Sequence, residues 1–160
     1  MDISIKNIDG SNWRECTKLE VAESQKNFIP SNLYSIAESR FKMGMKIFGV
    51  YKGAVMIGFA SYILDEQGDM NLYKLMIDKH SQGNGYGKKA LIILMDIIKN
   101  ETENKEIWLS LHPDNSVSIK LYRDYGFNQE ITGLEAEDEI FFKYNKFALD
   151  GNKFKERQVI

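Results

Sequence analysis

The sequence contains little of what builds metal centres or covalent cross-links. Its 160 residues include one cysteine, Cys16, and two histidines, His80 and His112, which lie far apart in the chain. A lone cysteine cannot form an internal disulfide or a cysteine-based zinc site, and with no histidine nearby it lacks the usual partner that activates a thiolate. We therefore expect no metal and no covalent route through Cys16, which is predicted to pack in the core.

The chain also lacks a strong excess of one charge and any long apolar run. With 21 basic and 23 acidic residues its net charge is −2, so the chain has no excess of positive charge with which to bind a nucleic acid. No apolar stretch approaches a membrane span of about 18 residues, and residues 1–6 lack the basic start and apolar core of a signal peptide. These absences predict no nucleic acid, no membrane and a cytoplasmic location. They leave the oligomeric state open, a homodimer included.

Hydrophobic periodicity divides the chain into strands and helices without an internal repeat or a linker. A chain of 160 residues fits one domain, which we place at residues 1–145, with a mostly polar tail at 146–160. The predicted order is a strand at 3–8, helices at 12–24 and 32–43, a hairpin of 46–51 and 55–64, a strand at 71–77, a helix at 85–100, a strand at 106–111, a helix at 116–125, and a hairpin of 128–134 and 139–145. This mixture predicts an α/β (α+β) domain.

The two helices near the N-terminus are predicted to form a lid. Pro30 disfavours helix at the residue before it, so the chain bends between the helices at residues 25–32. The second helix is expected to turn its apolar residues inward, namely Leu33, Ile36, Ala37 and Phe41.

The most informative stretch is the loop between the strand at 71–77 and the helix after it. Three glycines, Gly83, Gly85 and Gly87, fall within five residues there. Glycine allows a sharp turn and a close approach of the backbone, so successive N–H groups can converge on an anion at the start of the helix. The loop therefore predicts a phosphate-bearing ligand.

Two common phosphate-binding loops do not match this one. A P-loop requires Gly-Lys-Ser/Thr, whereas Gly87 and Lys88 are followed by Lys89, so no hydroxyl is present for magnesium. The dinucleotide fingerprint requires Gly-x-Gly-x-x-Gly near the start of a βαβ unit, whereas this loop reads Gly-x-Gly-x-Gly in mid-chain. The alternative to a phosphate-binding loop is a glycine-rich hairpin that binds no ligand.

The segment Gln82-Gly83-Asn84-Gly85-Tyr86-Gly87 resembles the Gln/Arg-x-x-Gly-x-Gly/Ala signature of the GNAT family of N-acetyltransferases. Residues 115–127 resemble a second motif of that family, Asn-x-x-Ser/Ala-x-x-Leu-Tyr-x-x-x-Gly-Phe, at Asn115, Ser118, Leu121, Tyr122, Gly126 and Phe127. The order of predicted elements is similar to the GNAT fold over residues 1–145. The resemblance implies a mixed, mostly antiparallel central sheet flanked by helices, with a splayed central strand pair.

The same resemblance implies acetyl-CoA as cosubstrate and a role for particular residues. The amides of the loop would hold the pyrophosphate, a backbone N–H at Met76 or Ile77 would bind the acyl oxygen, and Tyr122 would protonate the departing thiolate. Asn115 would bond the pantetheine or cap its own helix. The residues expected at the cofactor are Leu75, Met76, Ile77, Gln82, Gly83, Asn84, Gly85, Tyr86, Gly87, Lys88, Asn115 and Ser118.

No motif fixes the base that takes the proton of the amine. An alkyl amine with a pKa of about 10.4 is uncharged in about one molecule in 10³ at neutral pH, so its proton must pass to a base directly or through water. The candidates are Glu23, Tyr73 and Glu38, and Glu23 joins Tyr122 in the predicted catalytic set.

Residues 24–38 and 75–78 resemble the bacterial spermine/spermidine acetyltransferases of this fold, which implies a polyamine as the amine substrate. A long polycation requires carboxylates and aromatic faces along a groove. The lid offers Tyr34, Glu20, Glu23 and Glu38, and the last hairpin offers Glu130, Glu135, Glu137, Asp138 and Glu139. An acidic turn that only keeps the protein soluble explains the hairpin equally well. A protein N-terminus, an aminoglycoside or an amino acid as acceptor, and a non-catalytic acetyl-CoA-binding module, remain the alternatives.

Overall fold

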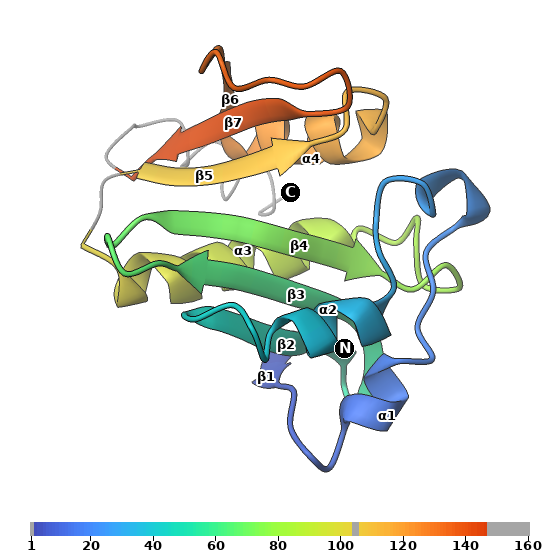
Figure 1. The fold of residues 1–160 in the computed structure, drawn as a ribbon. Coiled ribbons are helices and arrows are strands. Elements are labelled where there is room, and N and C mark those ends of the chain that lie inside the picture. The colour runs from blue at the N-terminus through green and yellow to red at the C-terminus, as the bar shows by residue number, and fades with distance from the viewer. Residues whose placement is uncertain (1, 104–105, 147–160) are drawn as a thin grey trace.

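The structure is a computed structural model that describes residues 2–103 and 106–146. Within them a seven-stranded sheet has the order β1-β2-β3-β4-β5-β7-β6, and its only parallel pair is β4 with β5. The predicted mixed, mostly antiparallel sheet is confirmed (Figure 1). The elements are β1 (Ile3–Asn7), α1 (Trp13–Cys16), η1 (Glu23–Gln25), α2 (Asn32–Glu38), β2 (Met45–Lys52), β3 (Val55–Leu64), β4 (Met70–Ile77), α3 (Tyr86–Glu101), β5 (Glu106–Leu111), α4 (Ser116–Tyr125), β6 (Asn128–Glu130) and β7 (Ile140–Asn145).

The pairing of β4 with β5 is short. It consists of Met70 opposite Ile107 and Asn71 opposite Trp108, although β4 continues to Ile77. Beyond Asn71 the two strands diverge, and Figure 1 shows their ribbons separating toward the arrowheads. The expected splayed strand pair is therefore present, and it divides the sheet into a four-stranded and a three-stranded part.

Two apolar clusters cover the two faces of the sheet. The larger contains the buried stripe of α3, namely Ala90, Leu91, Leu94, Met95 and Ile98, whereas Ile93 and Ile97 are only partly buried. Tyr122, Tyr125 and Phe127 from α4 and its C-terminal end join the same cluster. Figure 1 shows α3 behind the sheet and α1 and α2 in front of it.

The second cluster lies under α1 and α2 and contains Cys16, Met76 and Phe59. Cys16 is completely buried, so the prediction that it packs in the core is confirmed. Burial raises the pKa of its thiol to about 11, which disfavours the thiolate at neutral pH.

The first predicted helix, 12–24, is wrong in length, because α1 ends at Cys16. Tertiary hydrogen bonds replace the helical ones beyond that point. The Glu20 N–H donates to the Asp78 carboxylate at 2.9 Å, and the Lys79 N–H donates to the Glu20 carbonyl at 2.7 Å. These two bonds hold the chain at Glu20 against the loop after β4. Between α1 and α2 the chain then forms the short turn η1.

The second lid helix is also shorter than predicted, since α2 ends at Glu38 instead of residue 43. Leu33 and Phe41 were expected to point inward but are 56% and 88% exposed, and Ala37 is exposed as well. The backbone leaves the helix to reach Gly44, where a Cβ atom would lie 2.0 Å from the Leu64 carbonyl oxygen. This close approach to the end of β3 sets the path into β2 and ends the helix early.

The last hairpin is shorter than predicted too, because β6 ends at Glu130. The Glu135 carboxylate accepts hydrogen bonds from the N–H groups of Thr132 and Gly133, which closes a turn where strand was expected. Of the expected tail, residues 147–160 lie outside the described residues. Among the described helices none combines the length and the apolar character that crossing a membrane requires.

Candidate active site

The divergence of β4 from β5 opens two cavities. The larger, about 760 Å³, lies between the two strands, the lid and the end of the last hairpin. The smaller, about 450 Å³, lies at the glycine loop between the starts of α3 and α4. Ile29, Leu75 and Ser118 line both cavities, so the two adjoin where the strands part.

The glycine loop has the backbone that the sequence predicted for it. Gly83 and Gly85 have φ angles of +78° and +73°, in the left-handed region that favours glycine. A Cβ atom would meet nothing within 4 Å at either position, so conformation and not crowding requires glycine there. Gly87 has helical backbone inside α3, and its Cβ would lie 3.7 Å from Ile77, an ordinary contact.

The start of α3 supplies the electrostatics of the smaller cavity. Gly85 precedes the helix directly, and the first N–H groups of a helix have no partner within it and carry the positive end of its dipole. The cavity is lined by most of the residues expected at the cofactor, namely Leu75, Met76, Ile77, Gln82, Gly83, Gly85, Tyr86, Gly87, Lys88 and Ser118. The geometry suits an anion such as a pyrophosphate.

Two of the expected side chains, Asn84 and Gln82, brace the loop with hydrogen bonds. Asn84 does not line the smaller cavity, and its amide group donates to the carbonyls of Ser81 and Gln82 at 3.1 and 2.9 Å. The Gln82 amide group donates to the Ile77 carbonyl at 2.9 Å and to the Gln25 side chain at 2.8 Å. Gln82 thus ties the end of β4 to the lid.

The register of β4 distinguishes the two predicted backbone donors. The Asp78 N–H bonds to the Ile57 carbonyl at 2.8 Å, on the β3 side. Successive residues of a strand direct their peptide groups to alternate sides, so Met76 also faces β3, whereas Ile77 faces the side from which β5 has diverged. The Ile77 N–H is therefore the better placed of the two for an acyl oxygen in the cavity.

Helix α4 brings the second motif to the junction of the cavities. Asn115 caps the helix, because its Oδ1 atom accepts from the Ser118 N–H at 3.3 Å, and its side chain lines the larger cavity. Tyr122 lines the same cavity and is 5% exposed. Burial raises the pKa of Tyr122 far above its usual range, so the phenol stays protonated at neutral pH.

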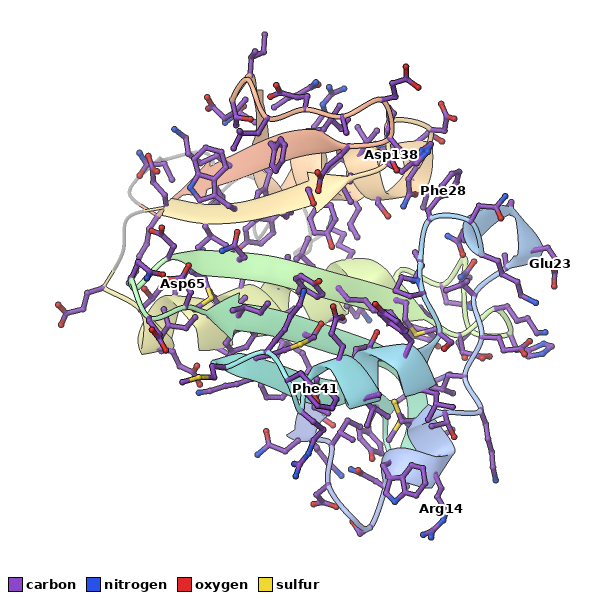
Figure 2. The ribbon with its side chains drawn as sticks, in the orientation of Figure 1. Arg14, Glu23, Phe28, Phe41, Asp65 and Asp138 are labelled. Carbon is purple, nitrogen blue, oxygen red and sulfur yellow. The ribbon has the colours of Figure 1, made fainter. Side chains whose placement is uncertain are left out.

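The structure brings two of the three base candidates to the larger cavity. Glu38 and Tyr73 line it, and the Tyr73 hydroxyl donates to Glu38 Oε1 at 3.1 Å. Glu23 lines neither cavity, its side chain is 81% exposed, and it pairs with Lys26. Figure 2 shows Glu23 at the outer edge of the molecule, away from the sheet.

Carboxylates predominate among the charged groups of the larger cavity. Glu38, Asp65, Asp138 and Glu139 line it. Figure 2 shows Asp65 near the beginning of β4 and Asp138 beyond the end of β5, so the charges are spread along the opening. Phe28 from the lid packs against His112 with ring centroids 4.6 Å apart, and both residues line this opening. The other acidic residues predicted for the site, Glu20, Glu23, Glu130, Glu135 and Glu137, do not line the cavity.

Two charged residues of the cavity, Asp65 and Lys74, were missed from the sequence. Lys74 on β4 is 8% exposed, and its ammonium donates to the Pro30 carbonyl, Asn32 Oδ1 and Ser35 Oγ at 2.6, 2.9 and 3.1 Å. Burial lowers its pKa to about 8. A signal was present, since Lys74 lies two residues before the buried Met76 and shares its strand face.

The model of the Acetyltransferase (GNAT) family matches residues 12–127. The spermine/spermidine N(1)-acetyltransferase of Bacillus subtilis (strain 168) is 30% identical over 134 residues, which cover 79% of this chain and 88% of that protein. A Bacillus subtilis subsp. natto protein that carries the name of a spermine N(1)-acetyltransferase is 31% identical with the same coverage. The [ribosomal protein bS18]-alanine N-acetyltransferase of Haemophilus ducreyi is 34% identical over 67 residues, or 42% of this chain and 43% of that one.

Solved structures support the fold independently. An acetyltransferase from Thermus thermophilus superposes with a TM-score of 0.73 at 13% identity, covering 91% of this chain and 97% of that one. The PaiA N-acetyltransferase of Thermoplasma acidophilum, solved in complex with coenzyme A, gives 0.68 at 18% identity, covering 91% and 99%.

Proposed function

Because the chain belongs to the GNAT family of acetyltransferases, we propose that it moves the acetyl group of acetyl-CoA directly to a primary amine of a polyamine such as spermidine or spermine. The observation that carries this proposal is the divergence of β4 from β5, which joins a cavity at a helix N-terminus to a cavity lined by carboxylates. A thioester in the first cavity meets an amine in the second.

The cofactor is assigned to the smaller cavity. The amides of the loop and of the first turn of α3 receive the pyrophosphate, with Lys88 beside them. The pantetheine arm takes the place that β5 leaves free along β4, between Leu75 and Ser118. The chemistry of this donor set fits the coenzyme, and the coenzyme A bound by the Thermoplasma relative agrees with it.

The transfer step uses groups at the junction of the cavities. The amine nitrogen attacks the thioester carbon, and the N–H of Ile77 stabilises the oxyanion that forms. The carbon–sulfur bond then breaks, and Tyr122 donates its hydroxyl proton to the thiolate. The proton released by the amine passes to water and from there to Glu38, to Tyr73 or to solvent, and a proton returns to Tyr122 from solvent. Glu23 has no part in this route.

The polyamine is assigned to the larger cavity. Its four carboxylates attract a polycation. Among residues 2–103 and 106–146, Lys74 is the one Lys or Arg that lines it, and three acceptors bind the Lys74 ammonium. The names of the two Bacillus relatives support this choice of acceptor. The Haemophilus relative, similar over less than half of the chain, makes the α-amine of a protein N-terminus the main rival.

A panel of acceptors tests the proposal. Release of CoA is followed with spermidine, spermine, a peptide that begins with alanine, an aminoglycoside and a free amino acid. We expect the polyamines to give the highest kcat/KM. Turnover of the peptide with none for the polyamines would reject the polyamine but not the acetyltransferase. CoA binding without turnover of any amine would reject both, and would identify a binding module.

A further inference from the structure

The structure contains an occupied ammonium site at the rim of the larger cavity. Lys42, just beyond α2, places its Nζ atom 4.3 Å from the centre of the Tyr73 ring and 2.9 Å from Glu38 Oε1. The same Nζ atom donates to the Tyr73 hydroxyl, which in turn donates to Glu38. An aromatic face, a phenol oxygen and a carboxylate thus surround one ammonium group.

The two residues that form this cage belong to the cavity, but their guest does not. Tyr73 and Glu38 line the larger cavity, whereas Lys42 reaches the cage from outside the set of lining residues. The Glu38 side chain is 16% exposed and that of Lys42 is 40% exposed. Tyr73 is itself 43% exposed, so the Glu38 carboxylate is the shielded wall of the cage, and the Tyr73 ring and its present occupant both lie toward solvent.

An alkyl ammonium group of a substrate has the same chemistry as the Lys42 side chain. Burial lowers the pKa of Lys42, but hydrogen bonds to Tyr73 and Glu38 outweigh it and raise that pKa, so the cage favours the charged form of an amine. Any primary ammonium that enters along the cavity meets the same three partners.

The cage also lies at a useful distance from the transfer point. Tyr73 and Ile77 are four residues apart on β4, so about 13 Å separates them along the strand. A long oligoamine spans a distance of this order with one nitrogen at each end, whereas a short monoamine cannot.

We propose that Glu38 and Tyr73 form a second ammonium subsite, which Lys42 fills as an internal placeholder until the distal ammonium of an oligoamine displaces it. The subsite sets the preference for acceptors with two or more distant amino groups. This inference rests on the proposed function, because the reacting amine of the same molecule must lie at the acyl group.

Removal of the placeholder gives the sharpest test. Lys42→Met keeps the length of the chain and deletes the ammonium, so an acceptor no longer competes with it. We expect KM for a triamine such as spermidine to fall about fivefold, because the exposed ion pair and aromatic contact of Lys42 compete with the substrate by about that factor. The KM for a monoamine and both kcat values are expected to stay unchanged. An unchanged or higher triamine KM would overturn the proposal.

The matched control is Lys120→Met. Lys120 also pairs with a carboxylate four residues away, Asp124, but it lies on the exposed side of α4 and lines neither cavity. This variant loses the same charge from the same kind of pair, and we expect it to leave the triamine KM unchanged. A fall in KM with Lys120→Met as large as with Lys42→Met would reduce the effect to net charge and reject the subsite.

Glu38→Gln separates the subsite from a role of Glu38 as the base. Loss of the subsite raises KM for the triamine alone, whereas loss of a base lowers kcat for triamine and monoamine alike. Calorimetric titration of spermidine without acetyl-CoA keeps the test independent of turnover. If no amine is acetylated, the proposed function fails, and tighter spermidine binding by Lys42→Met than by the wild type still supports the cage. Equal binding by the two rejects it.

Discussion

Lys74 Nζ donates to Asn32 Oδ1 at 2.9 Å and joins the centre of the sheet to the lid. Asn32 uses its own amide group to bond the Cys16 carbonyl at 3.0 Å, so the contact continues to α1. Lys74 also bonds the carbonyl of Pro30, the residue that bends the chain between the lid helices. One buried ammonium thus holds three parts of the lid over β4.

The titration of Lys74 predicts a pH-dependent stability. Its pKa is about 8 in the fold against its ordinary 10.5, so the folded protein binds fewer protons than the unfolded chain between these values. The free energy of unfolding that depends on Lys74 is therefore highest above pH 10.5, where the amine is neutral in both states. It decreases as the pH falls from 10.5 toward 8. As pH rises through this window, we expect the free energy of unfolding of the wild type to increase relative to that of Lys74→Met by up to about 1.4 kcal/mol per pH unit. Denaturant unfolding from pH 7 to pH 10 measures it, with Lys120→Met giving the background slope. Parallel curves for wild type and Lys74→Met would contradict the assignment.

The glycine loop predicts a separation of ligand affinity from stability. Gly85→Ala and Gly133→Ala each place a methyl group at a left-handed residue, with φ of +73° and +79°, and neither Cβ meets an atom within 4 Å. Both variants should lose about 1–2 kcal/mol of stability. Only Gly85 lines the smaller cavity, so we expect only Gly85→Ala to weaken CoA binding, by about tenfold or more. Calorimetry and thermal unfolding supply the two readouts, and equal CoA affinity in the two variants would show that the loop is only a turn.

Tyr122→Phe is expected to lower kcat about 100-fold with little change in the KM for acetyl-CoA, because a proton donor to the thiolate is lost. Tyr125→Phe is the control, since Tyr125 is buried on the same helix but lines neither cavity. Steady-state kinetics with thermal unfolding of both proteins separates catalysis from packing. A kcat that falls equally in both variants would assign Tyr122 to the core alone.

Glu23→Gln is expected to leave kcat and its pH profile unchanged within a factor of about two, as for exposed surface groups that do not touch the reacting atoms. Its carboxylate is exposed and paired with Lys26 on the outside of the lid. The pH dependence of kcat in the wild type and the variant provides the measurement. A large loss of kcat in Glu23→Gln would require the lid to move Glu23 into the cavity and would restore it as the base.

The parts of the fold set by local pattern were predictable. Helix α3 has apolar residues at helical spacing, and the loop before it has glycines where the backbone is left-handed, so the helix and the glycines Gly83 and Gly85 were identified. The splayed strand pair came from the resemblance to the family, because nothing local in β4 indicates where its partner strand leaves it.

The lid could not be predicted in the same way. Helix α1 stops at Cys16 because Glu20 bonds to Asp78 and Lys79, which lie about 60 residues further along the chain. The same long-range contacts decide which acidic residues reach the cavity. Glu38 enters it and Glu23 does not, although both lie on the lid at positions that a single sequence presents as equivalent.

The last hairpin offers a test of the charge argument with a control in the same turn. Asp138 and Glu139 line the larger cavity, whereas Glu137, one residue before them, does not. The double variant Asp138→Asn with Glu139→Gln should raise the spermidine KM several-fold at low salt and make it less sensitive to ionic strength, since screening acts on the lost attraction. Glu137→Gln should change neither quantity. Kinetics at about 20 and 200 mM salt decide the matter, because a rise in KM with Glu137→Gln as large as with the double variant would mean that the hairpin acts through net charge and not as a wall of the cavity.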